Sequence, residues 1–425
     1  MKPVSTWQDL LEWSPPAEPG REARLRRFEA VLRTYQRRFG PLPAVVKVTG
    51  TSGKGSVGAL LEAALLADGR AVGLFTSPHL ILPTERIRVG GRDVSLEALD
   101  GAVARTGPFL QELVEDLGPR FRPSFYEALL VLAFRLFAEA GCGIAVMEAA
   151  IGGAHDVLSR VPGSVSAITS VGLDHRDEIG PELADIARDK AGIATPGSTL
   201  VLGPTVEGVA RGEIERSAER RSVRLVDAAG AAVRAAGRGV EGHDVEVATE
   251  TGTTAFRLPL AGDFQVDNLK TAFTVLRVLK DLGEVVRLES IAGVAETRWP
   301  ARLEYLPGRP AWLLDSAHNE LGFQALSDFL SRSLPGPKSL LLGASDARKA
   351  GEALDILGPL FPAIHLVGGF FKAVDPRLLR EAPGSFPDPE SAVRFLRERH
   401  AGEEHCVVVA GSLYLAGACR AILLR

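Results

Sequence analysis

The stretch VVKVTGTSGKGSVGALLEAALLADG, residues 45–69, places an apolar run, a glycine-rich turn and a helix-like pattern in direct succession. The apolar run is typical of a buried strand, so the glycines fall between a strand and the first turn of a helix. Backbone N–H groups in such a turn, together with the positive end of the helix dipole, form a cradle for anions. The turn therefore predicts a phosphate-binding loop made by Gly50, Thr51, Ser52, Gly53, Lys54, Gly55 and Ser56.

Two side chains of this loop are expected to act on a bound nucleotide. Lys54 would neutralise the β- and γ-phosphates of ATP, and Ser56 would ligate Mg²⁺. The strict pattern G-x-x-x-x-G-K-[ST] is not met, because Val48 stands at the first glycine position and Gly55 separates the lysine from the serine. A purely structural glycine turn is the competing interpretation. The strand, loop and helix in succession favour nucleotide binding.

Short apolar runs alternate with helix-like segments from residue 44 to about residue 280. This alternation predicts an α/β fold with a mostly parallel sheet and crossover helices, in which ligands bind at the carboxyl ends of the strands. The polar residues that end each run are therefore candidates for a binding site. The runs are AVVKVTG (44–50), AVGLFTS (71–77), CGIAVMEAA (142–150) and VSAITSVGLDH (165–175).

A second alternating region follows a proline-containing segment. We therefore predict an ATP-binding domain with an N-terminal helical extension over residues 1–296, and a smaller C-terminal Rossmann-like α/β domain over residues 297–425. Residues 220–260 read as short strands with glycine-rich turns, which predicts an antiparallel patch inside the larger domain. The strands expected in the second domain are AWLLDSAHN (311–319), KSLLLGASD (338–346), AIHLVG (363–368) and HCVVVAGS (405–412).

The composition narrows the class of protein. The chain has 425 residues, 46% of them apolar and 24% charged, with a formal net charge of −4, which is typical of a globular protein rather than one that binds nucleic acid. Three cysteines without paired spacing indicate a reducing, cytoplasmic setting. The N-terminus lacks a long apolar core, and apolar runs stay below the length of about 18 residues that spans a membrane. We expect a cytoplasmic monomer acting on small molecules.

A series of blocks, in a constant order, resembles the Mur ligase superfamily and within it the folylpolyglutamate synthase/dihydrofolate synthase family. The blocks are distributed, in order, across nearly the whole chain. They are GTSGKGS (50–56), TSPHL (76–80), ERIRVGG (85–91), SFYEALLVLAF (124–134), EAAIGG (148–153), ITSVGLDH (168–175), IARDKAGI (186–193), GDFQVDN (262–268), WPARLE (299–304), LLDSAHNELG (313–322) and GSLYLAG (411–417).

The resemblance implies an ATP-dependent ligase that forms an acyl phosphate and then an amide. Such catalysis needs positioning and charge neutralisation more than a protein nucleophile. The reaction implied is the joining of glutamate to a folate-like or pteroate-like carboxylate. The alternatives are a Mur-type ligase for a non-folate acid, and a nucleotide-binding module without turnover.

By the same resemblance, Ser77, Glu148 and His175 match metal-binding positions for one or two Mg²⁺ ions, joined by Ser56 from the loop. Oxygen and imidazole ligands at separate strand ends suit such a site. For His175 the plain interpretation is a loop histidine capped by a neighbouring aspartate. Lys190 matches a lysine that the family carbamylates, which requires a buried, neutral amine; an ordinary lysine on a helix surface is the competing interpretation. Lys54, His175 and Lys190 are thus the expected catalytic residues.

Further matches imply contacts to the nucleotide and the substrate. The expected nucleotide contacts are Gln265, Asn268, Arg302, Asp315, His318 and Asn319, although Phe264 replaces the usual histidine of the Gln265 block. The family pattern GGRLDATN appears as GGAHDVLS at 152–159, so its long cation is absent while Asp156 is kept. His155 and Asp156 are therefore the expected substrate residues, and an altered acceptor specificity is expected there.

Overall fold

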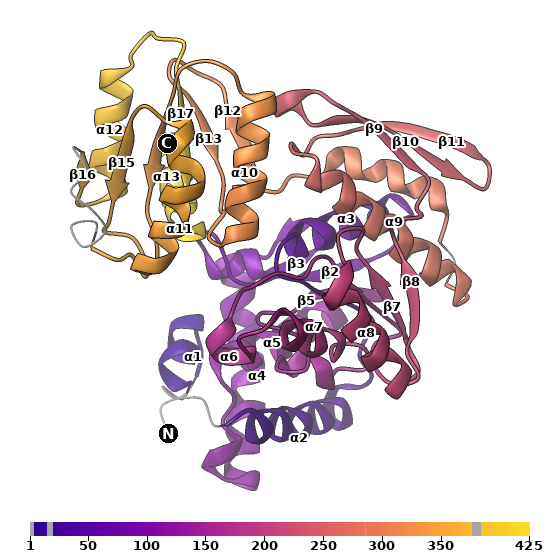
Figure 1. Cartoon of the computed structure of the whole chain (residues 1–425). Helices are drawn as coiled ribbons and strands as arrows, with labels where there is room; N and C mark the ends of the chain where they lie inside the picture. Colours follow the sequence, from indigo (N-terminus) through magenta and orange to yellow (C-terminus); the bar gives the residue numbers. More distant parts are fainter. Residues whose placement is uncertain (1–3, 15–19, 285, 376–383) are drawn as a thin grey trace. The chain divides into compact units, whose positions relative to one another are not determined.

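The computed structural model describes residues 4–14, 20–284, 286–375 and 384–425 (Figure 1). Contacts divide the chain into two compact units. Unit 1 comprises Met1–Ala232 and Asp267–Val294, and unit 2 comprises Val233–Val266 and Ala295–Arg425. The domain bounds expected from the sequence, 1–296 and 297–425, remain a prediction. In the structure, contacts group residues 233–266 with the C-terminal segment.

Unit 1 is built on an eight-stranded sheet with the order β4-β3-β2-β5-β1-β6-β7-β8. The strands from β2 to β8 in this order run parallel, and β3 and β4 form an antiparallel edge. The predicted mostly parallel sheet is therefore confirmed. The strands are β1 Ala44–Thr49, β2 Val72–Phe75, β3 Ile87–Val89, β4 Arg92–Asp93, β5 Ile144–Glu148, β6 Val165–Ile168, β7 Thr199–Leu202 and β8 Arg224–Asp227.

Helices cover both faces of this sheet because alternate strand residues point to opposite sides. Leu74 and Val146 face α3, where a β-carbon on Gly58 would stand 3.1 Å from the Leu74 side chain. Phe75 and Met147, their neighbours in sequence, join the core on the other face. The helices are α1 Trp7–Trp13, α2 Arg21–Phe39, α3 Lys54–Ala67, α4 Leu96–Leu117, α5 Phe125–Glu139, α6 Arg176–Ile179, α7 Leu183–Ala191, α8 Gly208–Arg220 and α9 Phe264–Asp281, with 3-10 helices η1 Pro83–Arg86, η2 Pro119–Phe121, η3 Val157–Arg160 and η5 Leu288–Glu296.

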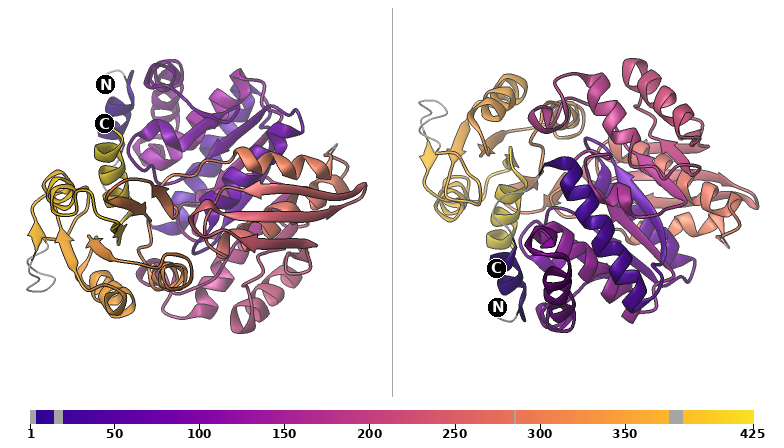
Figure 2. Two further views of the ribbon diagram at one scale, coloured as in Figure 1. Left: turned by 90° about the horizontal axis from the view of Figure 1, so that it is seen from above. Right: turned by 90° about the horizontal axis from the view of Figure 1, so that it is seen from below.

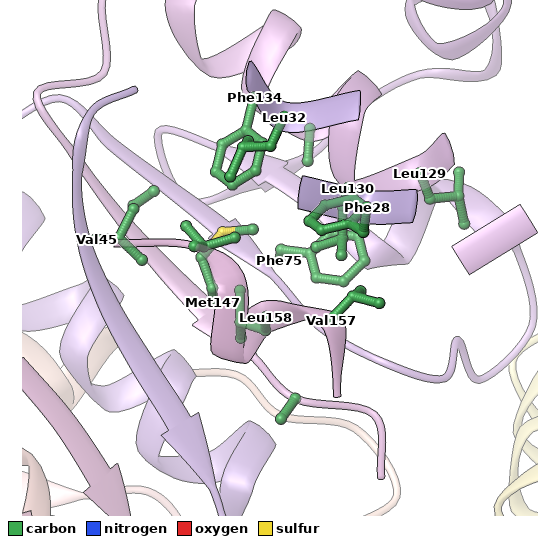
Figure 3. Close-up of a cluster of buried hydrophobic side chains, with 14 of the residues drawn as sticks. Phe28, Leu32, Val45, Phe75, Leu129, Leu130, Phe134, Met147, Val157 and Leu158 are labelled. Carbon is green, nitrogen blue, oxygen red and sulfur yellow. The ribbon is translucent and has the colours of Figure 1, made fainter. Parts of the chain in front are cut away.

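The N-terminal helical extension is part of the core of unit 1. Figure 3 shows Phe28 and Leu32 of α2 among Phe75, Phe134 and other buried apolar side chains. Complete burial of a phenylalanine or leucine stabilises a fold by about 1.5–3 kcal/mol. The extension therefore contributes to the stability of the sheet that carries the phosphate loop.

Lys47 is the basic residue of the central strand β1, and its side chain is completely buried. Its Nζ donates hydrogen bonds to the Val161 carbonyl oxygen and to Thr195 Oγ1, both at 3.0 Å. Burial, with a smaller contribution from the charge of Arg221, lowers the pKa of Lys47 to about 7. The amine thus ties β1 to the segments that precede β6 and β7.

Unit 2 contains two sheets (Figure 2). The six-stranded sheet has the order β12-β13-β17-β14-β15-β16, and only the β12–β13 pairing is antiparallel. The smaller sheet is the antiparallel β11-β10-β9. The elements are β9 Val233–Gly237, β10 His243–Thr249, β11 Gly252–Leu258, β12 Glu304–Leu306, β13 Ala311–Leu314, β14 Lys338–Leu342, β15 Ile364–Val367, β16 Ser385–Phe386, β17 Cys406–Ala410, α10 Glu320–Ser333, α11 Ala347–Leu357, α12 Pro389–Arg399, α13 Leu413–Leu423, η4 Gly239–Glu241 and η6 Gly358–Leu360.

The expectation for residues 220–260 is correct in part. β9, β10 and β11 form the predicted antiparallel patch, but it belongs to unit 2 and not to the larger unit. The first strand of the segment, β8, pairs in parallel with β7 at the edge of the large sheet. Its partner lies more than 20 residues upstream, so a local pattern of short strands could not reveal this pairing.

Cys142, Cys406 and Cys419 are free thiols, and all three are buried. Burial raises the pKa of Cys142 above its usual value, and raises the pKa of Cys406 and of Cys419 to about 12.

In the part of the chain that the structure describes, no helix combines the length and apolar character needed to cross a bilayer.

Candidate active site

The phosphate loop predicted from the sequence joins β1 to the first turn of α3. Two of its glycines are required by geometry. Gly53, at the N-cap of α3, has a φ of +86°, a backbone conformation that side chains disfavour. Gly50 has a φ of +155°, and a β-carbon on it would stand 1.9 Å from Thr169 Oγ1. The loop therefore passes too close to β6 for any residue other than glycine at position 50.

Hydrogen bonds to the segment after β6 hold the loop in place. Ser52 N donates to Ser170 Oγ at 2.9 Å, and Ser170 Oγ donates to the Ser52 carbonyl oxygen at 3.0 Å. Thr51 Oγ1 donates to the Gly172 carbonyl oxygen at 3.1 Å and accepts from Gly172 N at 3.0 Å. The loop is thus preformed, so little ordering entropy opposes the binding of an anion.

Lys54 is the first residue of α3, and its side chain folds back over the loop. Its Nζ donates to the Gly50 carbonyl oxygen at 3.0 Å and lies 3.5 Å from that of Thr51. The ammonium group therefore lies at the helix N-terminus, where a phosphate would bind. Ser56 is buried within the same first turn, next to Gly55.

Ser77 and Glu148 come together at the carboxyl ends of the adjacent strands β2 and β5. Ser77 N donates to Glu148 Oε2 at 3.3 Å, and Ser77 Oγ accepts from an Arg86 guanidinium nitrogen at 3.4 Å. Glu148 is only 6% exposed. The hydroxyl and carboxylate oxygens present here are the hard donors that suit Mg²⁺.

His175 precedes α6 and adopts a left-handed conformation, with a φ of +52°. Carboxylates flank its ring: Nε2 lies 4.0 Å from Asp174 Oδ2, and Nδ1 lies 3.8 Å from Glu178 Oε2. Burial lowers the pKa of His175, and the charges of Lys54 and Lys190 lower it further against the opposing effect of the carboxylates. The charges of Lys54 and Lys190 therefore act on His175, so the three residues expected to be catalytic influence one another electrostatically.

Lys190 lies in the last turn of α7, and its side chain is buried, with 3% of the residue exposed. Burial lowers the pKa of Lys190 to about 7, and the positive charge of Lys54 contributes to this effect against the charges of Asp189 and Asp174. A large fraction of its amine is thus neutral near neutral pH. The alternative of an ordinary surface lysine is inconsistent with this burial.

Asp189 is a residue that the sequence analysis missed. Its carboxylate accepts hydrogen bonds from Gly153 N at 2.8 Å and from His155 N at 3.0 Å, and it also contacts His155 Nδ1. The residue before Lys190 therefore fixes the loop after β5, and the His155 ring is directed at this carboxylate. Its position next to Lys190 was the available signal.

Asp156 is buried and holds the same loop from within. It accepts from Ala150 N at 2.7 Å, from Leu158 N at 2.8 Å and from the Tyr126 hydroxyl at 3.2 Å. Burial raises the pKa of Asp156, while these hydrogen bonds oppose the shift. The contacts give Asp156 a structural role; a direct contact of Asp156 or His155 with substrate stays a prediction.

Asn268 brings α9 to the phosphate loop within unit 1. A β-carbon on Gly53 would stand 2.4 Å from Asn268 Oδ1, so the amide lies directly against the loop. Gln265, one turn earlier on the same helix, is completely buried and is grouped with unit 2.

The remaining predicted nucleotide contacts cluster in unit 2 around the end of β13. Asp315 accepts from Leu303 N at 2.9 Å and from Ala317 N at 2.8 Å, which fixes the turn. Arg302 contacts the Ser316 hydroxyl, and it stands between Ala301 and Leu303, both at positive φ. His318 Nδ1 lies 2.9 Å from the Ser316 carbonyl oxygen, and Asn319 caps α10 by accepting from Gly322 N at 3.0 Å.

Comparisons with known proteins were made for sequence and structure. No protein-family model matches the chain. The chain is 30% identical over 390 residues to folylpolyglutamate synthase from Lacticaseibacillus casei, covering 89% of this chain and 90% of that protein. It is 31% identical over 421 residues to a probable bifunctional folylpolyglutamate synthase/dihydropteroate synthase from Haloferax volcanii, covering 94% of this chain. The chain spans only 49% of that bifunctional relative and 33% of its Halobacterium salinarum counterpart.

Solved structures agree with these relatives. A folylpolyglutamate synthase complex with AMPPCP and folate superposes with a TM-score of 0.85 at 26% identity, covering 99% of this chain and 100% of the other. The Mycobacterium tuberculosis folylpolyglutamate synthase complexed with ADP and AMPPCP gives a TM-score of 0.84 at 26% identity, covering 98% and 97%.

Proposed function

Because the chain belongs to the folylpolyglutamate synthase family, we propose that it is an ATP-dependent ligase that joins glutamate to a folate-like or pteroate-like carboxylate. The observation that carries this proposal is the preformed anion loop, in which Lys54 Nζ donates to the Gly50 carbonyl oxygen and Ser170 fixes Ser52. The relatives are named for folate substrates, which favours such an acceptor over a non-folate acid.

The reaction divides into two transfers. The acceptor carboxylate attacks the γ-phosphorus of ATP, ADP leaves, and an acyl phosphate forms. The amino group of glutamate then attacks the acyl carbon, loses a proton and displaces phosphate, which leaves an amide. The backbone N–H groups of Gly50–Ser56 would hold the phosphates, and the Lys54 ammonium would stabilise the charge that develops on them.

Mg²⁺ fits the residues present. The oxygen donors of Ser56, Ser77 and Glu148, with the His175 ring kept neutral by burial, are the side chains that would hold one or two ions. A bound Mg²⁺ would neutralise the negative charge of the phosphates. Lys190 would be carbamylated, since a buried lysine with a pKa of about 7 offers the neutral amine that adds to CO₂.

The remaining nucleotide contacts expected from the sequence extend the proposal. Gln265, Asn268, Arg302, Asp315, His318 and Asn319 would position ATP, with Asn268 acting at the phosphate loop that it touches. His155 and Asp156 would shape the acceptor site through the loop after β5. We also propose a cytoplasmic location, consistent with three unpaired thiols, and a monomer, which sedimentation velocity would test.

The test is phosphate release and product mass with ATP, Mg²⁺ and glutamate. Dihydropteroate, tetrahydrofolate, and simple aryl and alkyl acids are supplied in turn. We expect saturable phosphate release that requires both glutamate and a pterin acid, with a product heavier by one glutamyl residue. Turnover only with a non-pterin acid, or phosphate release independent of any acceptor, would contradict the proposal.

A further inference from the structure

The turn between α12 and β17 in unit 2 gathers two histidines and a glutamate. The rings of His400 and His405 stack with centroids 3.7 Å apart and an interplanar angle of 2°. Glu403 Oε2 lies 2.8 Å from His400 Nδ1. One ligand atom of each of the three side chains falls within 4.8 Å of the others.

We propose that His400, Glu403 and His405 bind a divalent transition-metal ion of the Zn²⁺ class. Two imidazole nitrogens and one carboxylate oxygen are a donor set that such ions prefer, whereas Mg²⁺ and Ca²⁺ prefer oxygen ligands. Zn–N bonds of about 2.0–2.1 Å in tetrahedral geometry place ligand atoms roughly 3.3 Å apart. Because the lone pair of an imidazole nitrogen lies in the ring plane and the two rings are parallel, one ring must rotate before both nitrogens can face one ion, with water as the fourth ligand.

The surroundings of the three side chains are compatible with this rearrangement. The Glu403 side chain is 58% exposed and can turn toward the rings, while the His400 side chain is 13% exposed. His400 Nε2 is buried and has no hydrogen-bond partner among the described residues. His405 Nε2 lies 3.0 Å from the hydroxyl of the buried Ser339 on β14. An outer partner of this kind orients a ligating imidazole and leaves its other nitrogen for the metal.

The position of the turn separates this cluster from the proposed ligation chemistry. His405 directly precedes β17, at the amino end of that strand, whereas Asp315 follows the carboxyl end of the parallel strand β13. The cluster and Asp315 thus lie at opposite ends of the parallel strands of the six-stranded sheet. A bound ion would join the end of α12 to the start of β17, and it would stabilise unit 2 without taking part in catalysis.

The test uses the full-length protein after chelation and desalting, with excess Mg²⁺ and AMPPCP present to occupy the proposed nucleotide site. We expect one Co²⁺ per chain to give visible d–d absorption bands, and Zn²⁺ to displace it. Zn²⁺ should also raise the melting temperature. In a separate assay with ATP and without AMPPCP, Zn²⁺ should leave the ligation rate unchanged.

Variants then assign the ligands. Loss of an outer partner of a metal ligand costs about 10–100-fold in affinity, and loss of a ligand should cost at least as much. We therefore expect His400→Gln and His405→Gln to weaken Zn²⁺ binding by about 100-fold or more, and Glu403→Gln by about 10-fold or more. Glu404→Gln is the matched control, since this neighbouring carboxylate pairs with Arg309 at 3.3 Å outside the cluster, and it should bind within twofold of wild type. Wild-type protein that takes up neither ion, or affinities unchanged in all three variants, would overturn the proposal. Because Glu403 is exposed, its variant keeps the test decisive even if a histidine variant misfolds.

Discussion

Gly153 lies directly against the backbone of Lys190: a β-carbon on this glycine would stand 2.5 Å from the Lys190 carbonyl oxygen and 2.7 Å from that of Asp189. Ala154 N also donates to the Asp189 carbonyl oxygen at 2.7 Å. The loop after β5 and the last turn of α7 therefore behave as one piece. The position of Lys190 therefore depends on residue 153 having no side chain.

Gly153→Ala should displace the loop from α7 and lower the ligation rate by about 10²-fold, because small misplacements of catalytic groups carry penalties of that order. The cost in unfolding free energy should be about 1–3 kcal/mol. Steady-state kinetics and thermal melting measure both effects. Gly143→Ala is the control, since a β-carbon there meets nothing within 4 Å. Equal activity of the two variants would show that the contact is unimportant.

Lys54→Gln and Glu148→Gln should each lower ATP-dependent ligation by about 10²–10³-fold. The first removes a cation at the transferring phosphate, and the second removes a proposed ligand of the Mg²⁺ that would neutralise it. Circular dichroism should show an unchanged fold. Lys349→Gln, outside the described site, should retain full activity. If either site variant turns over within a few-fold of wild type, the assignment of that residue is wrong.

Lys190→Ala should abolish ligation, and acetate or formate should partly restore it by replacing the anionic oxygens of the proposed carbamate. In a crystal structure at neutral or alkaline pH, density at Nζ should extend into a planar carboxylate group. Because carbamylation requires the neutral amine of Lys190, ligation activity should rise as the pH increases through about 7. An unmodified Nζ, together with no rescue by any short carboxylate, would refute carbamylation.

Lys47 should make stability depend on pH. Its pKa is about 7 in the folded protein against 10.5 for an ordinary lysine, so between these values the unfolded chain binds more protons and stability rises with pH. Below about pH 7 both states are protonated, and the cost of burying the charge is constant. Urea titrations from about pH 7 to about pH 8.5 should therefore show a slope that Lys47→Met reduces by up to about 1.4 kcal/mol per pH unit. Parallel slopes for the two proteins would contradict this expectation.

The features predicted best from the sequence were those encoded locally. The phosphate loop and the strand ends followed from glycine spacing and apolar runs, and the mostly parallel sheet is confirmed. The roles of Lys47 and Asp189 could not be predicted in the same way. Lys47 finds its acceptors 114 and 148 residues away, and Asp189 binds backbone groups 34 and 36 residues away. A pattern within one segment carries no information on such partners.

The three buried thiols allow the unfolding of each unit to be followed separately. Cys142 belongs to unit 1, and Cys406 and Cys419 belong to unit 2. A thiol that is both shielded and protonated reacts with an alkylating reagent only after the surrounding structure has opened. Pulse alkylation during slow denaturation, followed by peptide mapping, would therefore record the order in which the two units unfold, without any dye or engineered residue.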